Sequence, residues 1–189
     1  MPIADLISLR ERALNCFDCP LGNQCTNVVF GVGFTAAPPI AFVGEAPGEQ
    51  EDFDGEPFVG RAGRLLTKFI EWMGYTRNDV YICNTVLCRP PSNRKPLPNE
   101  LAACSGFLRE QLAQVRPRVI VALGATAGQV LTGSTQGVEN LRGSWWKWEG
   151  IPLRVTFHPS YLLRVPARRA DAYADLNAVL IRLSESVQT

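Results

Sequence analysis

The sequence has little of several features, and each shortage excludes a class of protein. It holds one histidine among 189 residues, so a metal site built from several histidines is impossible. Its longest strongly apolar stretch, 119–125, is far shorter than the roughly 20 residues that a membrane-spanning helix needs. Residues 1–5 carry neither a basic head nor an apolar run, so no secretory signal is expected. We therefore expect a cytoplasmic protein that does not associate with membranes.

Neither sign of charge is in excess. The 19 basic and 18 acidic residues leave a net charge of +1, which argues against a general nucleic-acid binder. The distribution is uneven, however. Acidic residues gather between 45 and 56, and basic residues gather at 89–95 and at 142–169, where Glu149 is the only acid. Such basic segments either form a local polyanion-binding face or are ordinary solvated surface.

The chain is long enough for one full hydrophobic core. A chain of this size buries roughly 70% of its unfolded surface on folding, and the composition of 46% hydrophobic and 20% charged residues is that of a globular protein. We therefore expect a single domain over 1–189.

The six cysteines suggest a bound metal centre. Cys16 and Cys19 can bind one centre together, and Cys88 and Cys104 follow far along the chain. Four cysteines in this arrangement suit either a tetrahedral zinc ion or an iron–sulfur cluster. A redox-active pair at 16–19 is disfavoured because no thioredoxin-like strand and helix surround it. Cys25 and Cys83 are interpreted as small buried hydrophobic residues, although Cys25 is near enough to compete as a ligand.

Hydrophobic periodicity predicts strands that alternate with helices. Short apolar runs predict strands at 40–43, 80–83, 119–123 and 153–157, with a further strand or ribbon at 145–148. Helical spacing predicts helices at 4–14, 61–73, 99–115, 125–131 and 170–184. Asn99 is the expected cap of the third helix, and the prolines at 90–98 predict a stiff loop. This alternation implies a parallel sheet that is covered on both faces.

Residues suited to chemistry follow three of the predicted strands directly. Glu45 lies in the segment after the first strand, Asn84 follows the second, and His158 follows the fourth. In parallel α/β sheets, ligands bind beyond the carboxyl ends of the strands. We therefore expect these side chains to share one site.

The segment 44–48 matches neither a P-loop nor a dinucleotide-binding fingerprint, so nucleotide cofactors are not expected. Pro47 and Gly48 predict a rigid turn that brings backbone N–H groups close to a ligand. Glu45 and Glu51 are candidates for positioning a water molecule or stabilising positive charge, although loop glutamates are usually only solvated.

The other candidates each have a functional and a structural interpretation. The Asn84 carboxamide matches the N3–H and O4 edge of uracil, or it forms a turn. Phe58 stacks on a base, or it packs in the core. His158 donates a hydrogen bond to a developing negative charge, or it is a structural hydrogen-bonder. The segment 161–164 places an apolar wedge beside a cation, as in side chains that insert into base stacks, or it simply packs.

Together these motifs resemble the signatures of the family 4 uracil-DNA glycosylases. The first signature is GEAPG at 44–48 with GEPFVGRAGRLL at 55–66, the second is NTVLCRPPSNRKP at 84–96, and the third is HPSYLLR at 158–164. Cys16, Cys19, Cys88 and Cys104 match the four cluster cysteines of that family in order and approximate spacing. The resemblance extends from about residue 10 to the end of the chain.

The resemblance implies a three-layer α/β/α fold with a four-stranded parallel central sheet. It implies a structural 4Fe-4S cluster held by those four cysteines, with 1–38 as the cluster-binding segment. It further implies that a monomer acts on uracil-containing DNA, single- or double-stranded. Such an enzyme flips out the uracil and hydrolyses its N-glycosidic bond, leaving an abasic site.

The resemblance also implies roles for individual residues. Asn84 reads the uracil edge, Phe58 stacks on the ring, and His158 stabilises charge at O2. Glu51 helps to exclude the thymine methyl group, and Glu45 lies beside the sugar. The full set of catalytic and substrate-binding residues is Glu45, Ala46, Glu51, Phe58, Asn84 and His158. The DNA-contacting residues are Arg89, Asn93, Ser160, Leu162, Leu163 and Arg164.

Two departures from related patterns are relevant to these roles. Family 1 enzymes carry a water-orienting aspartate at the position where this chain has Ala46. Family 4 members carry small residues at that position, as this chain does. Glu45 is then the preferred candidate for activating the water. The segment 165–171 is shorter than in other family members, which affects the expected DNA contacts there.

Three alternatives remain open from the sequence. The first is a non-catalytic iron–sulfur module that binds DNA, which the presence of Glu45, Asn84 and His158 argues against. The second is the same fold acting on other deaminated bases or trapping the abasic product. The third is a redox carrier, which is disfavoured because the cysteines are dispersed along the chain.

Overall fold

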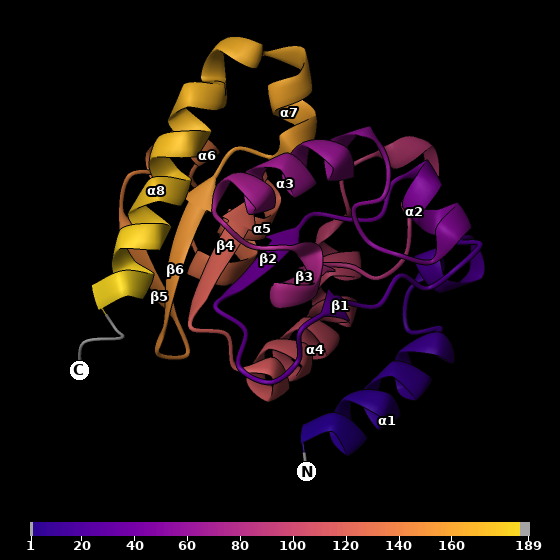
Figure 1. Ribbon diagram of the computed structural model, residues 1–189. Helices are drawn as coiled ribbons and strands as arrows, with labels where there is room; N and C mark the ends of the chain where they lie inside the picture. Colours follow the sequence, from indigo (N-terminus) through magenta and orange to yellow (C-terminus); the bar gives the residue numbers. More distant parts are fainter. Residues whose placement is uncertain (1, 186–189) are drawn as a thin grey trace.

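The computed structural model describes residues 2–185, with side chains from Leu6 onward. A six-stranded sheet runs through its centre in the order β1-β3-β2-β4-β6-β5 (Figure 1). The strands are β1 (Val32–Gly33), β2 (Ile40–Gly44), β3 (Tyr81–Asn84), β4 (Val119–Leu123), β5 (Trp145–Trp148) and β6 (Ile151–Thr156).

The four central strands are parallel to one another. This confirms the predicted four-stranded parallel sheet, and each of its strands lies where a short apolar run predicted it. The sheet is larger than predicted because an antiparallel strand is added at each edge. At one edge, the predicted ribbon at 145–148 is β5. At the other edge, β1 has only two residues, which is too short to produce a periodic pattern.

The long helices lie close to their predicted positions. They are α1 (Pro2–Leu14), α3 (Arg61–Trp72), α4 (Pro98–Val115), α5 (Gly124–Thr132) and α8 (Arg169–Glu185). The predicted cap at Asn99 is wrong, because α4 begins one residue earlier, at Pro98. The side chain of Glu100 accepts the free backbone N–H of Leu97 at 2.7 Å instead.

Several short helices were not predicted. They are α2 (Glu49–Asp54), α6 (Val138–Leu141), α7 (Pro159–Arg164) and the single 3₁₀ turns Pro20–Asn23, Arg77–Asp79, Pro91–Asn93 and Pro166–Arg168. Each spans too few residues for helical periodicity to show. Two of them matter for the site, because α7 and the turn at Pro91–Asn93 occupy segments that the sequence presented as loops.

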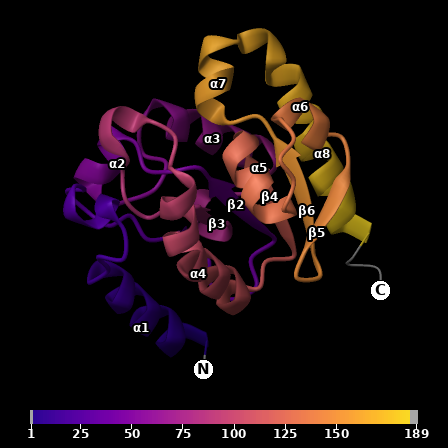
Figure 2. The ribbon, with the colours of Figure 1, turned by 180° about the vertical axis from the view of Figure 1, so that it is seen from behind.

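Helices cover both faces of the sheet and bury its two sets of alternating side chains. One face packs Ala41 and Val43 against α1, α4 and α5, whereas the other packs Ile40 and Phe42 against α3, α7 and α8. Figures 1 and 2 show these two layers from opposite sides of the sheet. Among the described residues, no helix has both the length and the apolar character needed to cross a membrane.

Candidate active site

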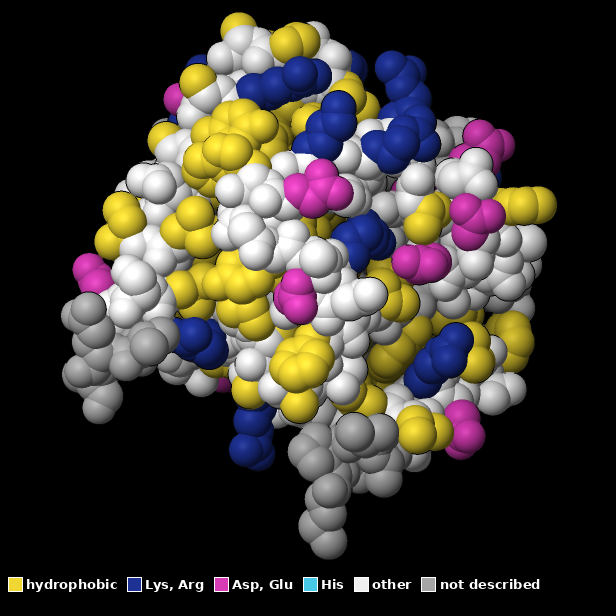
Figure 3. Space-filling view, in the orientation of Figure 1, with side chains coloured by type: hydrophobic (Ala, Val, Ile, Leu, Met, Phe, Trp, Pro, Cys, Tyr) yellow, Lys and Arg dark blue, Asp and Glu magenta, His cyan; other side chains and the backbone are white. Residues whose placement is uncertain are grey.

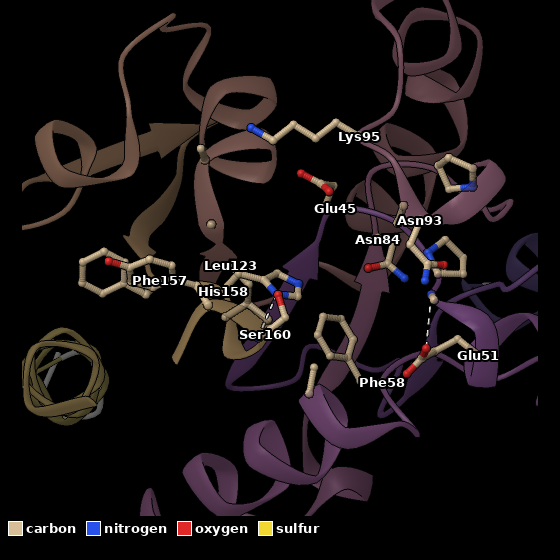
Figure 4. A pocket seen from close by; sticks show the side chains of 18 of the residues that line it. Glu45, Glu51, Phe58, Asn84, Asn93, Lys95, Leu123, Phe157, His158 and Ser160 are labelled. Atoms are coloured by element: carbon tan, nitrogen blue, oxygen red, sulfur yellow. Dashed lines mark hydrogen bonds between the residues drawn. The ribbon is translucent and has the colours of Figure 1, made fainter. Parts of the chain in front are cut away.

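A cavity of about 540 Å³ opens at the carboxyl ends of the parallel strands. This volume lies within the usual range for small-molecule sites. The structure brings most of the predicted site residues to its wall (Figure 4). Nine of those predicted from sequence line it: Glu45, Ala46, Glu51, Phe58, Asn84, Asn93, His158, Ser160 and Arg164. The arrangement follows from the parallel sheet, whose strands all end at this edge.

Asn84 ends β3 and offers a buried acceptor that has no partner. Its side chain is 2% exposed, and its Oδ1 accepts no hydrogen bond within the described part of the chain. A Cβ atom at Gly44 would lie 2.4 Å from this oxygen and 2.5 Å from the Phe58 ring, so only glycine leaves room for both. An unpaired buried carbonyl costs free energy in the absence of a ligand. Asn84 is therefore prepared to accept a hydrogen bond from a group that enters the cavity.

Phe58 forms an aromatic wall between Asn84 and His158 (Figure 4). Its ring centre lies 5.7 Å from that of His158, with the planes inclined by 34°. The backbone of Phe58 has a φ of +56°, which is rarely adopted by a bulky residue and is maintained only by surrounding contacts.

Arg77 supplies those contacts and was not identified from the sequence. Its guanidinium donates to the carbonyl oxygens of Pro57 at 2.8 Å and Phe58 at 3.1 Å. It also lies 3.6 Å from the Glu56 carboxylate. No sequence signal connects a surface turn at 77–79 with a loop some twenty residues earlier. Arg77 thus holds the Phe58 backbone in its unusual conformation.

His158 is held as a neutral ring that donates from one nitrogen. Its Nδ1 accepts the backbone N–H of Ser160 at 3.1 Å and lies 2.8 Å from the Ser160 hydroxyl. An Nδ1 that accepts carries no proton, so the proton of the neutral ring is on Nε2. Burial, with a further contribution from the positive charge of Arg164, lowers the pKa of His158 to about 4. The ring therefore presents an N–H donor near neutral pH.

Glu45 follows β2 and is fixed at both its backbone and its side chain. The Thr85 hydroxyl donates to the Glu45 carbonyl oxygen at 2.5 Å. The Thr126 hydroxyl, from α5, donates to the carboxylate oxygen Oε2. The carboxylate therefore has a defined position at the cavity wall.

Glu51 closes the loop around the cavity. One of its carboxylate oxygens accepts the backbone N–H of Gly48 at 3.1 Å. The other accepts those of Val59 at 3.0 Å and Gly60 at 2.9 Å. Glu51 thus ties the segment 44–48 to the chain that leads into α3, and its role toward thymine stays a prediction.

The proline-rich segment forms a rigid rim. Arg94 makes two hydrogen bonds, of 2.8 and 2.7 Å, with the buried carboxylate of Glu100, so this arginine is a structural anchor. Arg89 donates to the Asn93 side chain at 2.7 Å. Ser92 and Asn93 both have a φ of +54°, and strained backbone of this kind often occurs at binding sites. Asn93 and Lys95 are exposed and line the cavity.

Known proteins resemble this chain over most of its length. The family model described as the uracil DNA glycosylase superfamily matches residues 30–181. The type-4 uracil-DNA glycosylase of Thermotoga maritima is 52% identical over 159 residues, which cover 82% of this chain and 81% of that protein. The corresponding protein of Archaeoglobus fulgidus is 40% identical over 89% of this chain and 88% of its own length. The chain belongs to the type-4 uracil-DNA glycosylases.

The type-4 assignment is supported by the extent of the matches. The type-4 protein of Saccharolobus solfataricus is 39% identical over 95% of this chain. A type-5 uracil-DNA glycosylase of Pyrobaculum aerophilum, also 39% identical, matches over only 44% of this chain.

One of the glycosylase's predicted DNA contacts is wrong. Leu162 is fully buried and packs in the core beneath α3 and α8, so it is not an exposed wedge. The reason is that the predicted loop is the helix α7, which turns Leu162 inward. Leu163 is half-buried, whereas Arg164 is exposed and lines the cavity. Ser160 also lines the cavity, but its hydroxyl lies against His158, and its contact with DNA stays a prediction.

Three of the six basic residues in the segment 142–169 of the glycosylase are paired with acidic residues, so only part of the suggested polyanion face carries free positive charge. Arg142 and Arg154 both lie 2.9 Å from the buried carboxylate of Asp175. Arg168 pairs with Glu139 and Asp171 at 2.7 and 2.8 Å. The acids come from outside the segment, which is why counting within it overstated its charge. Basic side chains do gather around α7 on the face shown in Figure 3.

The four predicted cluster cysteines of the glycosylase converge. Cys16, Cys19, Cys88 and Cys104 all line a second, small cavity of about 20 Å³. Burial, strengthened by neighbouring thiolates, raises the pKa of Cys104 to about 12. Within residues 2–185, no group of three or more His, Cys, Asp or Glu side chains is placed to hold a metal ion.

The two remaining cysteines differ from each other. Cys83 is fully buried in β3, which confirms its interpretation as a small core residue. Cys25 is only half-buried and packs against the small buried cluster formed by Leu21, Val86 and Cys88.

Proposed function

We propose that this type-4 glycosylase removes uracil from DNA by hydrolysing the N-glycosidic bond, leaving an abasic site. The observation that carries the proposal is the unpaired Asn84 Oδ1, which lies in one cavity with the Phe58 ring and the neutral His158. A base inside a duplex cannot reach such a cavity. The target nucleotide must therefore be flipped out, at a cost of a few kcal/mol.

Base recognition falls to Asn84 and Phe58. The Asn84 carbonyl accepts N3–H of uracil while its NH₂ donates to O4, whereas cytosine offers the opposite pattern. Phe58 stacks on the pyrimidine ring. We place the exclusion of the thymine methyl group in the loop that Glu51 holds closed with its three backbone hydrogen bonds.

Bond cleavage requires donors at the base and negative charge at the sugar. The departing uracil takes both bonding electrons, and the Nε2–H of His158 donates to O2 where this negative charge develops. The sugar gains positive charge, which the Glu45 carboxylate stabilises while it orients the attacking water. The water oxygen bonds to C1′ and releases a proton, and uracil leaves with a proton taken up from solvent.

DNA binding outside the cavity is assigned to exposed polar residues at its rim. Arg164 and Asn93 line the cavity mouth, and Arg89 supports Asn93 through its hydrogen bond. These side chains are suited to phosphate contacts, which orient the DNA without reading its sequence.

We also propose that Cys16, Cys19, Cys88 and Cys104 hold a 4Fe-4S cluster. Their convergence on one small cavity lined mainly by apolar side chains supports a four-thiolate group. A cluster bonds each thiolate to a different iron, so its thiolates need not meet at a single ion as zinc ligands do. The group would join the segment after α1 to α4 and to the rim of the active site, and its role is structural.

The cluster is tested by metal analysis of protein purified without oxygen. We expect iron and acid-labile sulfide in the wild type and in Cys83→Ala, and loss of both in Cys88→Ser. About one zinc per chain without iron or sulfide would contradict the proposal.

The glycosylase activity is tested with a labelled oligonucleotide that contains one uracil, followed by hot alkali. We expect strand cleavage at the uracil, and a loss of about 10²- to 10³-fold in rate for His158→Ala. Oligonucleotides with hypoxanthine, or with thymine opposite guanine, measure the selectivity. DNA binding without cleavage by the wild type would instead support a non-catalytic module.

A further inference from the structure

Thr126 makes a contact that its position in a helix does not explain. It lies in the first turn of α5 and is 8% exposed. The hydroxyl of a helical threonine can donate to a carbonyl one turn earlier. Thr132 of the same helix does so, donating to the Gly128 carbonyl at 2.7 Å. The Thr126 hydroxyl donates instead to the carboxylate of Glu45, 81 residues away in sequence.

We propose that Thr126 is a positioning residue for the glycosylase reaction and acts by orienting the Glu45 carboxylate. This inference rests on the function proposed above, in which Glu45 stabilises the sugar and orients the water. Thr126 does not line the cavity and acts only through Glu45.

The contact selects one orientation of a flexible side chain. Glu45 follows β2 outside regular structure and is half-buried, so its carboxylate could otherwise adopt several rotamers. The bond to Thr126 fixes Oε2, and Thr85 fixes the backbone of the same residue. Because Thr126 bonds Oε2, Oε1 is the carboxylate oxygen left for the sugar or the water.

The other carboxylate oxygen of Glu45, Oε1, is therefore held in a defined direction. A carboxylate that must support a transition state is effective only when its geometry is set beforehand. Loss of a hydrogen bond to a charged group corresponds to about 10- to 100-fold in rate.

The test measures single-turnover uracil excision at saturating enzyme, together with DNA affinity. We expect Thr126→Val, which keeps the volume but removes the hydroxyl, to lower the rate about 10- to 100-fold with little change in DNA affinity. Thr126→Ser, which restores the hydroxyl, should recover most of the rate. Thr132→Val is the matched control on the same helix and should match the wild type.

A double-mutant cycle separates positioning from general damage. In the Glu45→Ala background, Thr126→Val should have no further effect on the rate, because the carboxylate it orients is absent. Thermal unfolding shows whether each variant is folded. If Thr126→Val does not fold, Thr126→Ala takes its place in the same measurements.

Any of three results overturns the inference. Thr126→Val excises uracil within twofold of the wild-type rate, or Thr126→Ser is as slow as Thr126→Val. The third is that Thr126→Val lowers the rate of Glu45→Ala by the same factor by which it lowers that of the wild type. If the wild type excises uracil, none of these three results contradicts the proposed function. An inactive wild type overturns the proposed function and this inference with it.

Discussion

At the scale of single residues, the glycosylase site is built from polar atoms that the fold leaves unpaired or fixes in one protonation state. Within residues 2–185, no group donates to the buried carbonyl of Asn84, and His158 is held neutral with Nδ1 as an acceptor. The sequence identified both residues, because each directly follows a predicted strand. It could not show their hydrogen bonds, since the partners of a side chain depend on the folded chain.

Asn84→Ala should abolish most activity without destabilising the protein. The rate of uracil excision should fall about 10²- to 10³-fold, while the free energy of unfolding stays within about 1 kcal/mol of the wild type, because the lost carbonyl was unpaired. Asn27→Ala is the matched control. The Asn27 amide donates to the carbonyls of Asp52 and Phe53 at 2.8 and 3.1 Å, so its loss should lower stability and not excision. Near wild-type excision by Asn84→Ala would contradict our account of base reading.

The lowered pKa of His158 makes the free energy of unfolding depend on pH. Its pKa in the folded chain is about 4, below the roughly 6.5 of an unfolded chain. Above pH 6.5 both states are neutral and the group does not affect stability. As the pH falls from 6.5 toward 4, the unfolded chain takes up a proton that the native state excludes, so the free energy of unfolding decreases.

Because the chain has one histidine, NMR follows this single imidazole without overlap. We expect a midpoint near 4 and no change in excision rate due to His158 between pH 5 and 8. A midpoint near the ordinary value would show that the ring is not held as a neutral donor.

At the scale of elements, the site depends on how closely α3 packs against the loop before it. Gly63 lies in the first turn of α3, where an added Cβ would come 1.8 Å from the Phe58 carbonyl oxygen. That oxygen also accepts from Arg77. Periodicity predicted α3 well, since its apolar residues recur over three turns. The loop conformation was not predictable, because it depends on contacts from a turn that follows α3.

Gly63→Ala should therefore displace Phe58 and damage both stability and activity. We expect a loss of about 1–3 kcal/mol in the free energy of unfolding, with reduced excision. Gly106→Ala is the matched control within helix α4, where no atom of the described residues lies within 4 Å of the added Cβ. It should stabilise the protein by about 0.5–1 kcal/mol. Denaturant unfolding measures both changes, and equal effects of the two substitutions would contradict the packing argument.

At the scale of the whole molecule, one buried carboxylate joins the last helix to the sheet. Asp175 of α8 is 2% exposed and accepts from Arg154 and Thr156 of β6, each at 2.9 Å. It also accepts from Arg142, at 2.9 Å. The same carboxylate pairs two of the six basic residues that suggested a polyanion-binding face for this region.

Asp175→Ala should lower the free energy of unfolding by about 3–5 kcal/mol, because it leaves two arginines without their buried partner. Glu110→Ala breaks the exposed pair with Arg12, whose atoms lie 2.9 Å apart, and should change stability little. Chemical denaturation of the two variants measures this contrast. A small effect of Asp175→Ala would show that the network does not anchor α8.

The sequence by itself determined the parallel strands, the long helices and the residues that gather at the sheet edge. These follow from local patterns, and parallel strands necessarily end at a common edge. Only the tertiary structure decided which atoms meet. Leu162 is buried because α7 folds inward, and Thr126 reaches Glu45 across 81 residues. Hydrogen bonds and burial depend on distances in space, and a chain's local periodicity contains no information about them.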